Sequence, residues 1–247
     1  MISVSIITKD EEANIQKCLE SVKWADEIII VDSGSTDQTL TICQSYNCKI
    51  IETEWLGFGQ TKQLGVHAAT NDWILSIDAD ETVSNELKVQ ILASIKVAEF
   101  YAFNIKRISY YLKKRIKYSG WQTDYPLRLF NKKYGNFNNA NVHEAVVMEK
   151  GVASIIQAPL YHYPYQSISS HINKINLYTQ LGAEKLFSQN KKSTLIYALL
   201  SGLVKFLKMY LIKKGFLDGK EGLVLATLSG FSSTLKYIKL WSLWRVK

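Results

Sequence analysis

Two aspartates separated by one residue, Asp78 and Asp80, stand at the end of the apolar run Trp73–Asp78. The β-branched and aromatic residues of this run predict a buried strand. Residues two apart in an extended chain point to the same side, so both carboxylates could face one ligand. Carboxylates at the end of a buried strand need positive charge nearby, and Mg²⁺ or Mn²⁺, which prefer oxygen ligands, would supply it. The alternative is an acidic turn in which Asp80 or Ser84 caps the following helix.

Strands and helices alternate in the part of the chain that leads to this pair. Near-continuous apolar runs predict strands over Ile2–Thr8 and Glu27–Asp32, and helical spacing separates them. This pattern predicts an α/β fold whose mostly parallel sheet is covered by helices on both faces. Ligands of such sheets bind beyond the carboxyl ends of the strands. Thr8, Asp32, Asp78 and Asp80 all occupy such ends, so the sequence predicts one site at one edge of the sheet.

Three further side chains are candidates for this site. Arg128 lies within the predicted strand Tyr125–Phe130. Glu144 precedes the predicted strand Val146–Ile156 and could act as a general base, although a glutamate at such a junction is often a surface residue. His162 lies among aromatic residues, where a histidine can be a metal ligand or a satisfied residue of the core or rim.

The segment Tyr110–Trp121 is aromatic and basic and ends in Ser119–Gly120. We expect a mobile loop here. Its lysines and arginine suit either a solvated basic face or a lip that meets an anionic substrate.

The positive charge of the chain is concentrated in its C-terminal quarter. Residues 191–247 hold 11 basic and 2 acidic residues, a net +9, whereas the whole chain carries +8 and residues 1–190 therefore carry −1. This division predicts a catalytic domain over residues 1–190 and a basic, amphipathic helical tail over residues 191–247. The stretch Thr194–Ile212 is largely apolar but contains lysines, which favours a helix at the membrane surface over core packing or a membrane span. A nucleic-acid binder is disfavoured, because the basic residues flank apolar helical stripes and do not line a groove.

The cysteines favour a cytoplasmic protein, and the absence of two sequence motifs argues against a dinucleotide-binding protein. Three cysteines without metal-site spacing favour reduced thiols in a cytoplasmic protein. No Gly-x-Gly-x-x-Gly motif follows the first predicted strand and no Gly-Lys-Ser/Thr phosphate-binding loop occurs, so a dinucleotide site is unexpected.

Three motifs in order resemble the family 2 glycosyltransferases. They are Val4–Glu12, Ile30–Asp37 and Ile77–Glu81. The resemblance implies a GT-A fold, a nucleotide-sugar donor and inversion at the anomeric carbon. Further stretches resemble the bacterial lipopolysaccharide inner-core β-1,4-glucosyltransferases, namely Gly57–Gln63, Arg128–Phe130, Val142–Glu144 and Gly215–Gly219.

The resemblance implies roles on the donor side of the site. Thr8 and Asp32 would hold the uracil and ribose, and Asp78 would touch the ribose or the sugar. Lys62 stands where the family often has an arginine near the base and diphosphate. Arg128 is also expected to bind the substrate.

The resemblance also implies a metal and a base. Asp80 would bind Mg²⁺ or Mn²⁺ directly, and His162 falls where many GT-A enzymes place a late metal-binding histidine. Glu144 matches the acceptor-side base, although this chain has His143–Glu144 where the family usually has Glu-Asp.

The implied activity is transfer of a sugar, glucose by the narrower resemblance, from a UDP-sugar to a hydroxyl of a lipopolysaccharide core or related glycolipid. The enzyme would then lie in the cytoplasm, held peripherally at the inner face of the membrane. One alternative is a non-enzymatic module that binds the membrane surface. Another is a sugar nucleotidyltransferase, which would favour a glycine-rich, basic turn where this chain has Lys9–Glu12.

Overall fold

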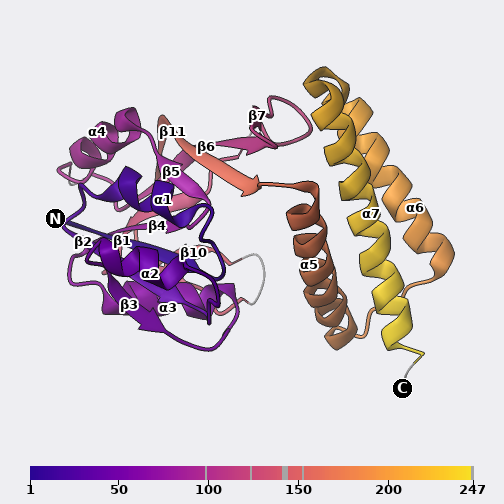
Figure 1. Cartoon of the computed structure of the whole chain (residues 1–247), viewed down its shortest axis with the longest axis horizontal. Coiled ribbons are helices and arrows are strands. Elements are labelled where there is room, and N and C mark those ends of the chain that lie inside the picture. Colours follow the sequence, from indigo (N-terminus) through magenta and orange to yellow (C-terminus); the bar gives the residue numbers. More distant parts are fainter. Residues whose placement is uncertain (98, 123, 141–143, 152, 246–247) are drawn as a thin grey trace. The chain divides into compact units, whose positions relative to one another are not determined.

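The structure is a computed structural model that describes residues 1–97, 99–122, 124–140, 144–151 and 153–245. It divides into two compact units (Figure 1). The first unit comprises residues 1–108 and 124–162, and the second comprises residues 109–123 and 163–247.

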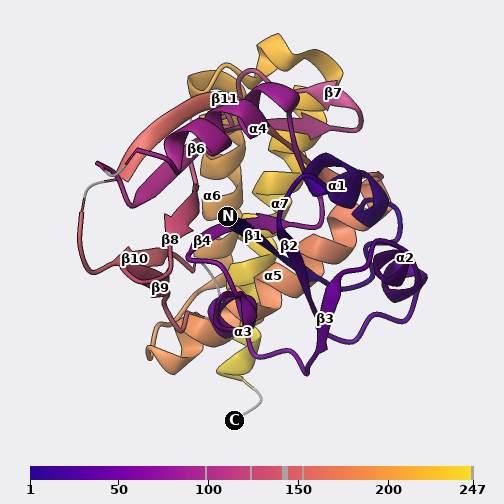
Figure 2. The same cartoon turned by 90° about the vertical axis from the view of Figure 1, so that its left-hand side faces the viewer.

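Four parallel strands form the half of the sheet that the sequence predicts. They lie next to one another in the order β3 (Lys49–Glu52), β2 (Glu27–Asp32), β1 (Ile2–Thr8) and β4 (Trp73–Asp78), as Figure 2 shows. Strands of this kind are rich in apolar residues because both of their faces are covered. The predicted parallel arrangement is therefore confirmed.

Helices cover both faces of these strands, as predicted. Along β2, Ile30 belongs to one hydrophobic cluster, whereas its neighbours Ile29 and Val31 belong to another. The first cluster contains residues of α1, α2 and α4, and the second contains Val66 of α3. These helices span Ile15–Val22 (α1), Thr39–Ser45 (α2), Phe58–Ala68 (α3) and Asn85–Ser94 (α4). Of the two residues considered as caps in the alternative to a metal site, Ser84 caps α4, because its side chain accepts a hydrogen bond from the Leu87 amide.

Beyond β4 the sheet contains antiparallel strands. Its order continues through β8 (Leu127–Asn131), β6 (Ala102–Tyr111), β11 (Ala153–Tyr165) and β5 (Glu81–Val83), and β7 (Lys114–Arg115) pairs with β6. Strands β9 (Gly135–Phe137) and β10 (Val146–Met148) form a separate antiparallel pair. The single strand predicted over 146–156 is thus wrong, because β10 ends at Met148 and β11 begins at Ala153.

Helices dominate the second unit. It contains α5 (Ile168–Ser188), α6 (Leu195–Leu207), the π-helical turn η1 (Lys208–Ile212), the 3₁₀ turn η2 (Gly215–Asp218) and α7 (Gly219–Leu243). Helix α7 packs against both α5 and α6 and lies between them in Figure 1. Counted by length and composition, Leu195–Ile212 is the one candidate membrane span among the described residues, and 17% of it is buried.

The segment predicted as a mobile loop, 110–121, forms part of this second unit. Tyr111 and Ile116 are buried in a cluster with Met209, Leu225 and Ala226. Buried Asp218 accepts hydrogen bonds from the amides of Lys117 and Tyr118 and from the Ser119 hydroxyl. The segment is therefore packed against C-terminal helices, and an encounter with an anionic substrate stays a prediction.

The compact units do not follow the predicted division at residue 190, because α5 and segment 109–123 group with the C-terminal helices. That division concerned catalysis and membrane association, and it stays a prediction.

Candidate active site

The register of the parallel strands brings the predicted polar residues to one edge of the sheet. Thr8 pairs with Asp32 across β1 and β2, and Ile7 pairs with Asp78 across β1 and β4. Because these residues end their strands, the side chains of Thr8, Asp32 and Asp78 belong to the same edge. The predicted convergence of the three strand ends is confirmed by this register.

Both carboxylate oxygens of Asp78 contact cationic side chains. Nζ of Lys62 lies 2.9 Å from Oδ1, and Nη2 of Arg128 lies 2.5 Å from Oδ2. The two cations are deeply buried, with side-chain exposures of 2% and 6%. Burial alone would raise the pKa of Asp78, but Arg128 and Lys62 outweigh it and hold the pKa well below its ordinary value. Asp78 is therefore a carboxylate fixed between two positive charges.

Lys62 also joins Asp78 to Glu144. Its Nζ atom lies 2.7 Å from Oε1 of Glu144. Close packing of α3 explains the burial of this lysine. A Cβ atom on Gly59 would collide with the Asn138 carbonyl oxygen, and one on Gly65 would collide with the Ser5 side chain. The two glycines thus let α3 approach the sheet and the 138–140 segment, between which Lys62 reaches both carboxylates. His143, the neighbour of Glu144 in the predicted motif, lies outside the described residues.

Glu81 extends the ionic network on the other side of Arg128. Its side chain is fully buried, and Oε1 accepts from Arg128 at 2.7 Å and from Arg107 at 2.9 Å. Oε2 accepts from the Asp78 amide at 3.0 Å. Asp124 binds the far side of Arg107 at 2.7 Å. Burial lowers the pKa of Arg107, but Glu81 and Asp124 outweigh burial and raise it.

The roles of Arg107, Asp124 and Glu81 escaped sequence reasoning. In the sequence, Glu81 was noted only as the last of three closely spaced acids, after Asp78 and Asp80. Arg107 follows Lys106 in β6, so its position alone does not show that its side chain is mostly buried, and only that burial requires an anionic partner.

Asp80 and His162 lie together beside this network. His162 Nε2 lies 3.6 Å from Asp80 Oδ1, and the two side chains are 16% and 10% exposed. The pairing of β11 with β5 causes this contact, because His162 lies opposite Glu81. Neighbouring ligands of one divalent cation lie about 3 Å apart, so these donors fit a shared ion after a small approach.

No group of three or more His, Cys, Asp or Glu side chains suited to a metal occurs in the part of the chain that the structure describes. A cation held by Asp80 and His162 would therefore need further oxygen ligands from water or from a substrate. Such an incomplete protein ligand set is typical of Mg²⁺ sites that share the ion with phosphate oxygens.

Asp32 organises the turn after β2. Its Oδ2 atom accepts from the Gly34 and Ser35 amides at 2.9 and 2.8 Å, and Ser35 also donates its hydroxyl to Oδ1. Thr8 Oγ1 and Ser33 Oγ are buried without a hydrogen-bond partner among the residues described. Buried hydroxyls of this kind need explanation, and a polar ligand at this edge would satisfy them.

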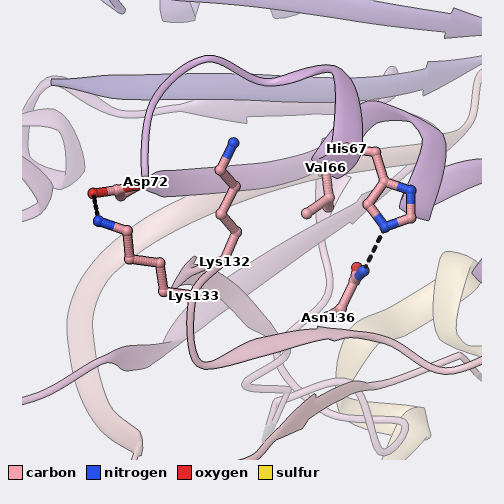
Figure 3. Close-up of a pocket in the computed structure, with 6 residues that line it drawn as sticks. All are labelled: Val66, His67, Asp72, Lys132, Lys133 and Asn136. Atoms are coloured by element: carbon pink, nitrogen blue, oxygen red, sulfur yellow. Dashed lines mark hydrogen bonds and ion pairs between the residues drawn. The ribbon is translucent and has the colours of Figure 1, made fainter.

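A separate pocket lies at the opposite edge of the sheet (Figure 3). It contains Asp72, which precedes β4, and its lining is completed by Val66, His67, Lys132, Lys133 and Asn136. Lys133 binds Asp72 at 2.6 Å, and His67 bonds to Asn136 at 3.1 Å. None of the predicted site residues lines this pocket, so we do not assign the reaction to it.

Sequence comparisons identify relatives of the whole chain. Residues 3–153 match the sequence model of Glycosyl transferase family 2. The chain is 35% identical over 251 residues to an uncharacterized glycosyltransferase of Rickettsia typhi, covering 97% of this chain and 86% of the relative. It is 28% identical over 243 residues to the lipopolysaccharide core biosynthesis glycosyltransferase LpsC of Rhizobium meliloti, covering 92% of this chain and 90% of LpsC.

A solved structure shares the fold. The crystal structure of residues 1–349 of TarS from S. aureus, in complex with UDP-GlcNAc, superposes with a TM-score of 0.52 and 15% sequence identity. The match covers 99% of this chain and 91% of the TarS chain. It supports the GT-A architecture that the motifs imply.

Proposed function

This chain belongs to glycosyl transferase family 2, and from that premise we propose that it transfers a sugar from a nucleotide-sugar to a hydroxyl of a lipopolysaccharide core or related glycolipid, with inversion. The observation that carries the proposal is the Lys62 bridge, which joins the donor-side carboxylate Asp78 to the candidate base Glu144. Similarity to LpsC supports the acceptor class. Glucose is the sugar that the narrower motif resemblance implies.

The donor would bind at the ends of β1, β2 and β4. Thr8 and Asp32 would face its uracil and ribose, and the buried hydroxyl of Thr8 has an unused hydrogen-bonding capacity for that purpose. Asp78 already binds two cations, so it would act on the sugar and ribose chiefly by keeping Lys62 and Arg128 in place. TarS, which shares the fold, binds UDP-GlcNAc, in line with a UDP-sugar here.

Asp80 and His162 are the residues that would hold Mg²⁺ or Mn²⁺. When bound, such an ion stabilises the negative charge that develops on the leaving nucleoside diphosphate. Lys62 and Arg128 are oriented by Asp78 and add fixed positive charge within the same network.

Glu144 would act on the acceptor. As the acceptor oxygen forms its bond to the anomeric carbon, the bond from that carbon to the diphosphate oxygen breaks and the hydroxyl proton passes to Glu144. Lys62 holds Oε1 of Glu144, so Oε2 would receive the proton. A positioned base typically accelerates such a step by about 10²–10⁴. One displacement from the face opposite the leaving group inverts the configuration.

The proposed acceptor is lipid-linked, and this gives the basic C-terminal region a role. We assign catalysis to residues 1–190 and peripheral association with the inner face of the cytoplasmic membrane to residues 191–247. The positive charge of this tail supports the assignment, because lysine and arginine are attracted to anionic lipid surfaces.

A panel of nucleotide-sugars tests the proposal. We expect one UDP-sugar to raise the melting temperature in the presence of Mn²⁺ or Mg²⁺ and to undergo slow hydrolysis, both effects being lost in excess chelator. A glycolipid or lipopolysaccharide core acceptor should then accelerate donor consumption. If no nucleotide-sugar stabilises the protein or is consumed, a non-enzymatic membrane-surface module becomes the better explanation.

A further inference from the structure

Helix α6 has its large apolar side chains on the outside and small residues on the inside. Its buried positions are Ala198 and Gly202. The exposed residues on α6 and η1 are mostly branched and apolar, and Ile196 is 73% exposed. We define the α6 outer face by Ile196, Leu199, Leu200, Leu203, Val204, Leu207, Leu211 and Ile212, all of which are exposed. A helix in water normally shows the opposite arrangement, with its apolar stripe toward the core.

The inner side of α6 packs against α7 through small residues. A Cβ atom on Gly202 would collide with the Thr234 side chain and the Gly230 carbonyl oxygen. The hydroxyls of Ser201 and Ser233 lie 2.5 Å apart. Close glycine contacts and serine hydrogen bonds between helices are typical of helix pairs in lipid, where outward apolar side chains contact acyl chains.

The charges around the α6 outer face indicate an anionic surface as its partner. No aspartate or glutamate occurs between residues 185 and 217. Exposed Lys205 and Lys208 interrupt the apolar sequence, and Lys191–Lys192 and Lys213–Lys214 flank it. Basic amphipathic helices of this kind lie in the interface of anionic bilayers, with lysines at the headgroups.

The same lysines distinguish an in-plane helix from one that crosses the bilayer. Leu195–Ile212 is long and apolar enough to cross, but a span would carry Lys205 and Lys208 into the hydrocarbon region, where charges are strongly disfavoured. An in-plane helix keeps the lysines at the headgroups while the α6 outer face enters the acyl region.

We propose that the α6 outer face is a lipid-contact surface that inserts side-on into an anionic phospholipid bilayer, with α7 packed on the side of α6 away from the lipid. This proposal specifies which surface of the chain would contact the membrane. Only the biological purpose of that contact rests on the proposed function. Lipid contact itself requires no sugar transfer.

Vesicle sedimentation of the full chain tests the surface. The probes are phosphatidylcholine vesicles with and without phosphatidylglycerol, and the variant is Leu199→Gln/Leu203→Gln. We expect this variant to lose about tenfold or more in partitioning to anionic vesicles. Lys205→Gln/Lys208→Gln should lose about fivefold per lysine. Val89→Gln/Ile155→Gln changes two exposed apolar residues of the first unit and should bind like the unchanged protein.

Three results would overturn the proposal. One is equal partitioning of the unchanged protein and the Leu199→Gln/Leu203→Gln variant. Another is a dimer in lipid-free buffer that this variant dissociates without any change in vesicle binding, which would assign the face to a second copy. The third is resistance of the bound protein to alkaline carbonate extraction, which would identify a span and contradict side-on insertion.

Measurements of donor hydrolysis separate this proposal from the proposed function. The Leu199→Gln/Leu203→Gln variant should hydrolyse the donor in solution at the unchanged rate, which also shows that it folds. Vesicle binding without hydrolysis of any nucleotide-sugar would refute the proposed function and leave the lipid-contact surface standing.

Discussion

Lys62 Nζ lies 2.7 Å from Glu144 Oε1, although 82 positions separate the two residues in the chain. The same nitrogen lies 2.9 Å from Asp78 Oδ1. One buried ammonium group thus holds a carboxylate from the end of a parallel strand next to a carboxylate from a distant loop. The two carboxylates would repel each other without it.

Lys62→Met should therefore destabilise the fold strongly. Removing one partner of a buried ion pair typically costs about 3–5 kcal/mol, because the remaining charge is left uncompensated. Lys23→Met is a matched control, since Lys23 forms an ion pair with Glu20 but both side chains are well exposed, and such pairs are worth about 0–1 kcal/mol. Urea denaturation measures both. Equal, small losses would show that the Lys62 bridge contributes little.

Glu144→Gln should separate donor binding from transfer. Removing the candidate base should lower the turnover number by about 10²–10⁴, while donor affinity changes little because Glu144 is assigned to the acceptor. Steady-state transfer assays and a donor titration measure the two effects. Glu149→Gln alters an exposed glutamate nearby and should remain active. A Glu144→Gln enzyme with near-normal turnover would place the base elsewhere.

Asp80→Asn should remove the stabilisation that UDP and Mn²⁺ produce together. The amide keeps the size of the side chain but loses the charge that a hard cation requires. Thermal denaturation with UDP, with and without Mn²⁺, measures this directly. Asp72→Asn, at the opposite edge of the sheet, should respond like the unchanged protein. An unchanged metal-dependent shift in the Asp80 variant would exclude it as a ligand.

Arg128→Met should lower the free energy of unfolding by about 3–5 kcal/mol, because Asp78 and buried Glu81 both lose a cation. Arg107→Met should cost less. Arg107 is 20% exposed, its partner Asp124 is 35% exposed, and Glu81 would still retain Arg128. Chemical denaturation of the two variants should therefore rank Arg128 above Arg107, and the reverse order would contradict the assigned network.

The protein should lose stability in mild acid, because His171 takes up a proton more readily in the unfolded chain than in the folded one. Burial, followed by the nearby charge of Lys174, lowers the pKa of His171 to about 4, whereas an unfolded chain has a histidine pKa of about 6.5. The unfolded state therefore binds the proton first as the pH falls. Stability present above pH ~6.5 should decline toward pH ~4, by up to about 3 kcal/mol.

Denaturation midpoints of the unchanged protein and of His171→Phe, measured between pH 7 and about 4, check this expectation. The variant loses the bond between His171 Nδ1 and the Tyr111 hydroxyl, 2.9 Å long, so its stability should start lower. Its dependence on pH should nevertheless be flatter. Identical slopes would show that His171 does not titrate differently in the two states.

The parallel part of the fold could be predicted because its signals are local. Apolar runs such as Ile2–Thr8 and Glu27–Asp32 define the strands, and the polar residue at each end follows from the sequence alone. The antiparallel part depends on pairing between distant segments. Strand β8 lies between β4 and β6, and β5 has only three residues, so neither position has a sequence signature.

The candidate site shows the same limit. Asp78, Lys62, Arg128 and Glu144 could each be named from motifs, but their shared ion pairs depend on packing across the sheet. Segment 110–121 was misinterpreted for a related reason, because the residues that cover Tyr111 and Ile116 come from the C-terminal helices. Roles in donor binding, metal binding and catalysis stay predictions until the experiments above are done.

The hydrogen bonds between Asp218 and segment 117–119 connect parts of the chain that are synthesised at different times, and this affects folding during synthesis. Tyr111 and Ile116 leave the ribosome roughly 100 residues before Leu225 and Ala226, which is about 5–20 s at ordinary synthesis rates. During that interval their apolar side chains lack the cover that the finished protein gives them. Nascent chains stalled before residue 218 should therefore recruit chaperones at segment 110–121. Shortened versions of the protein that end near residue 190 would leave the same segment exposed permanently.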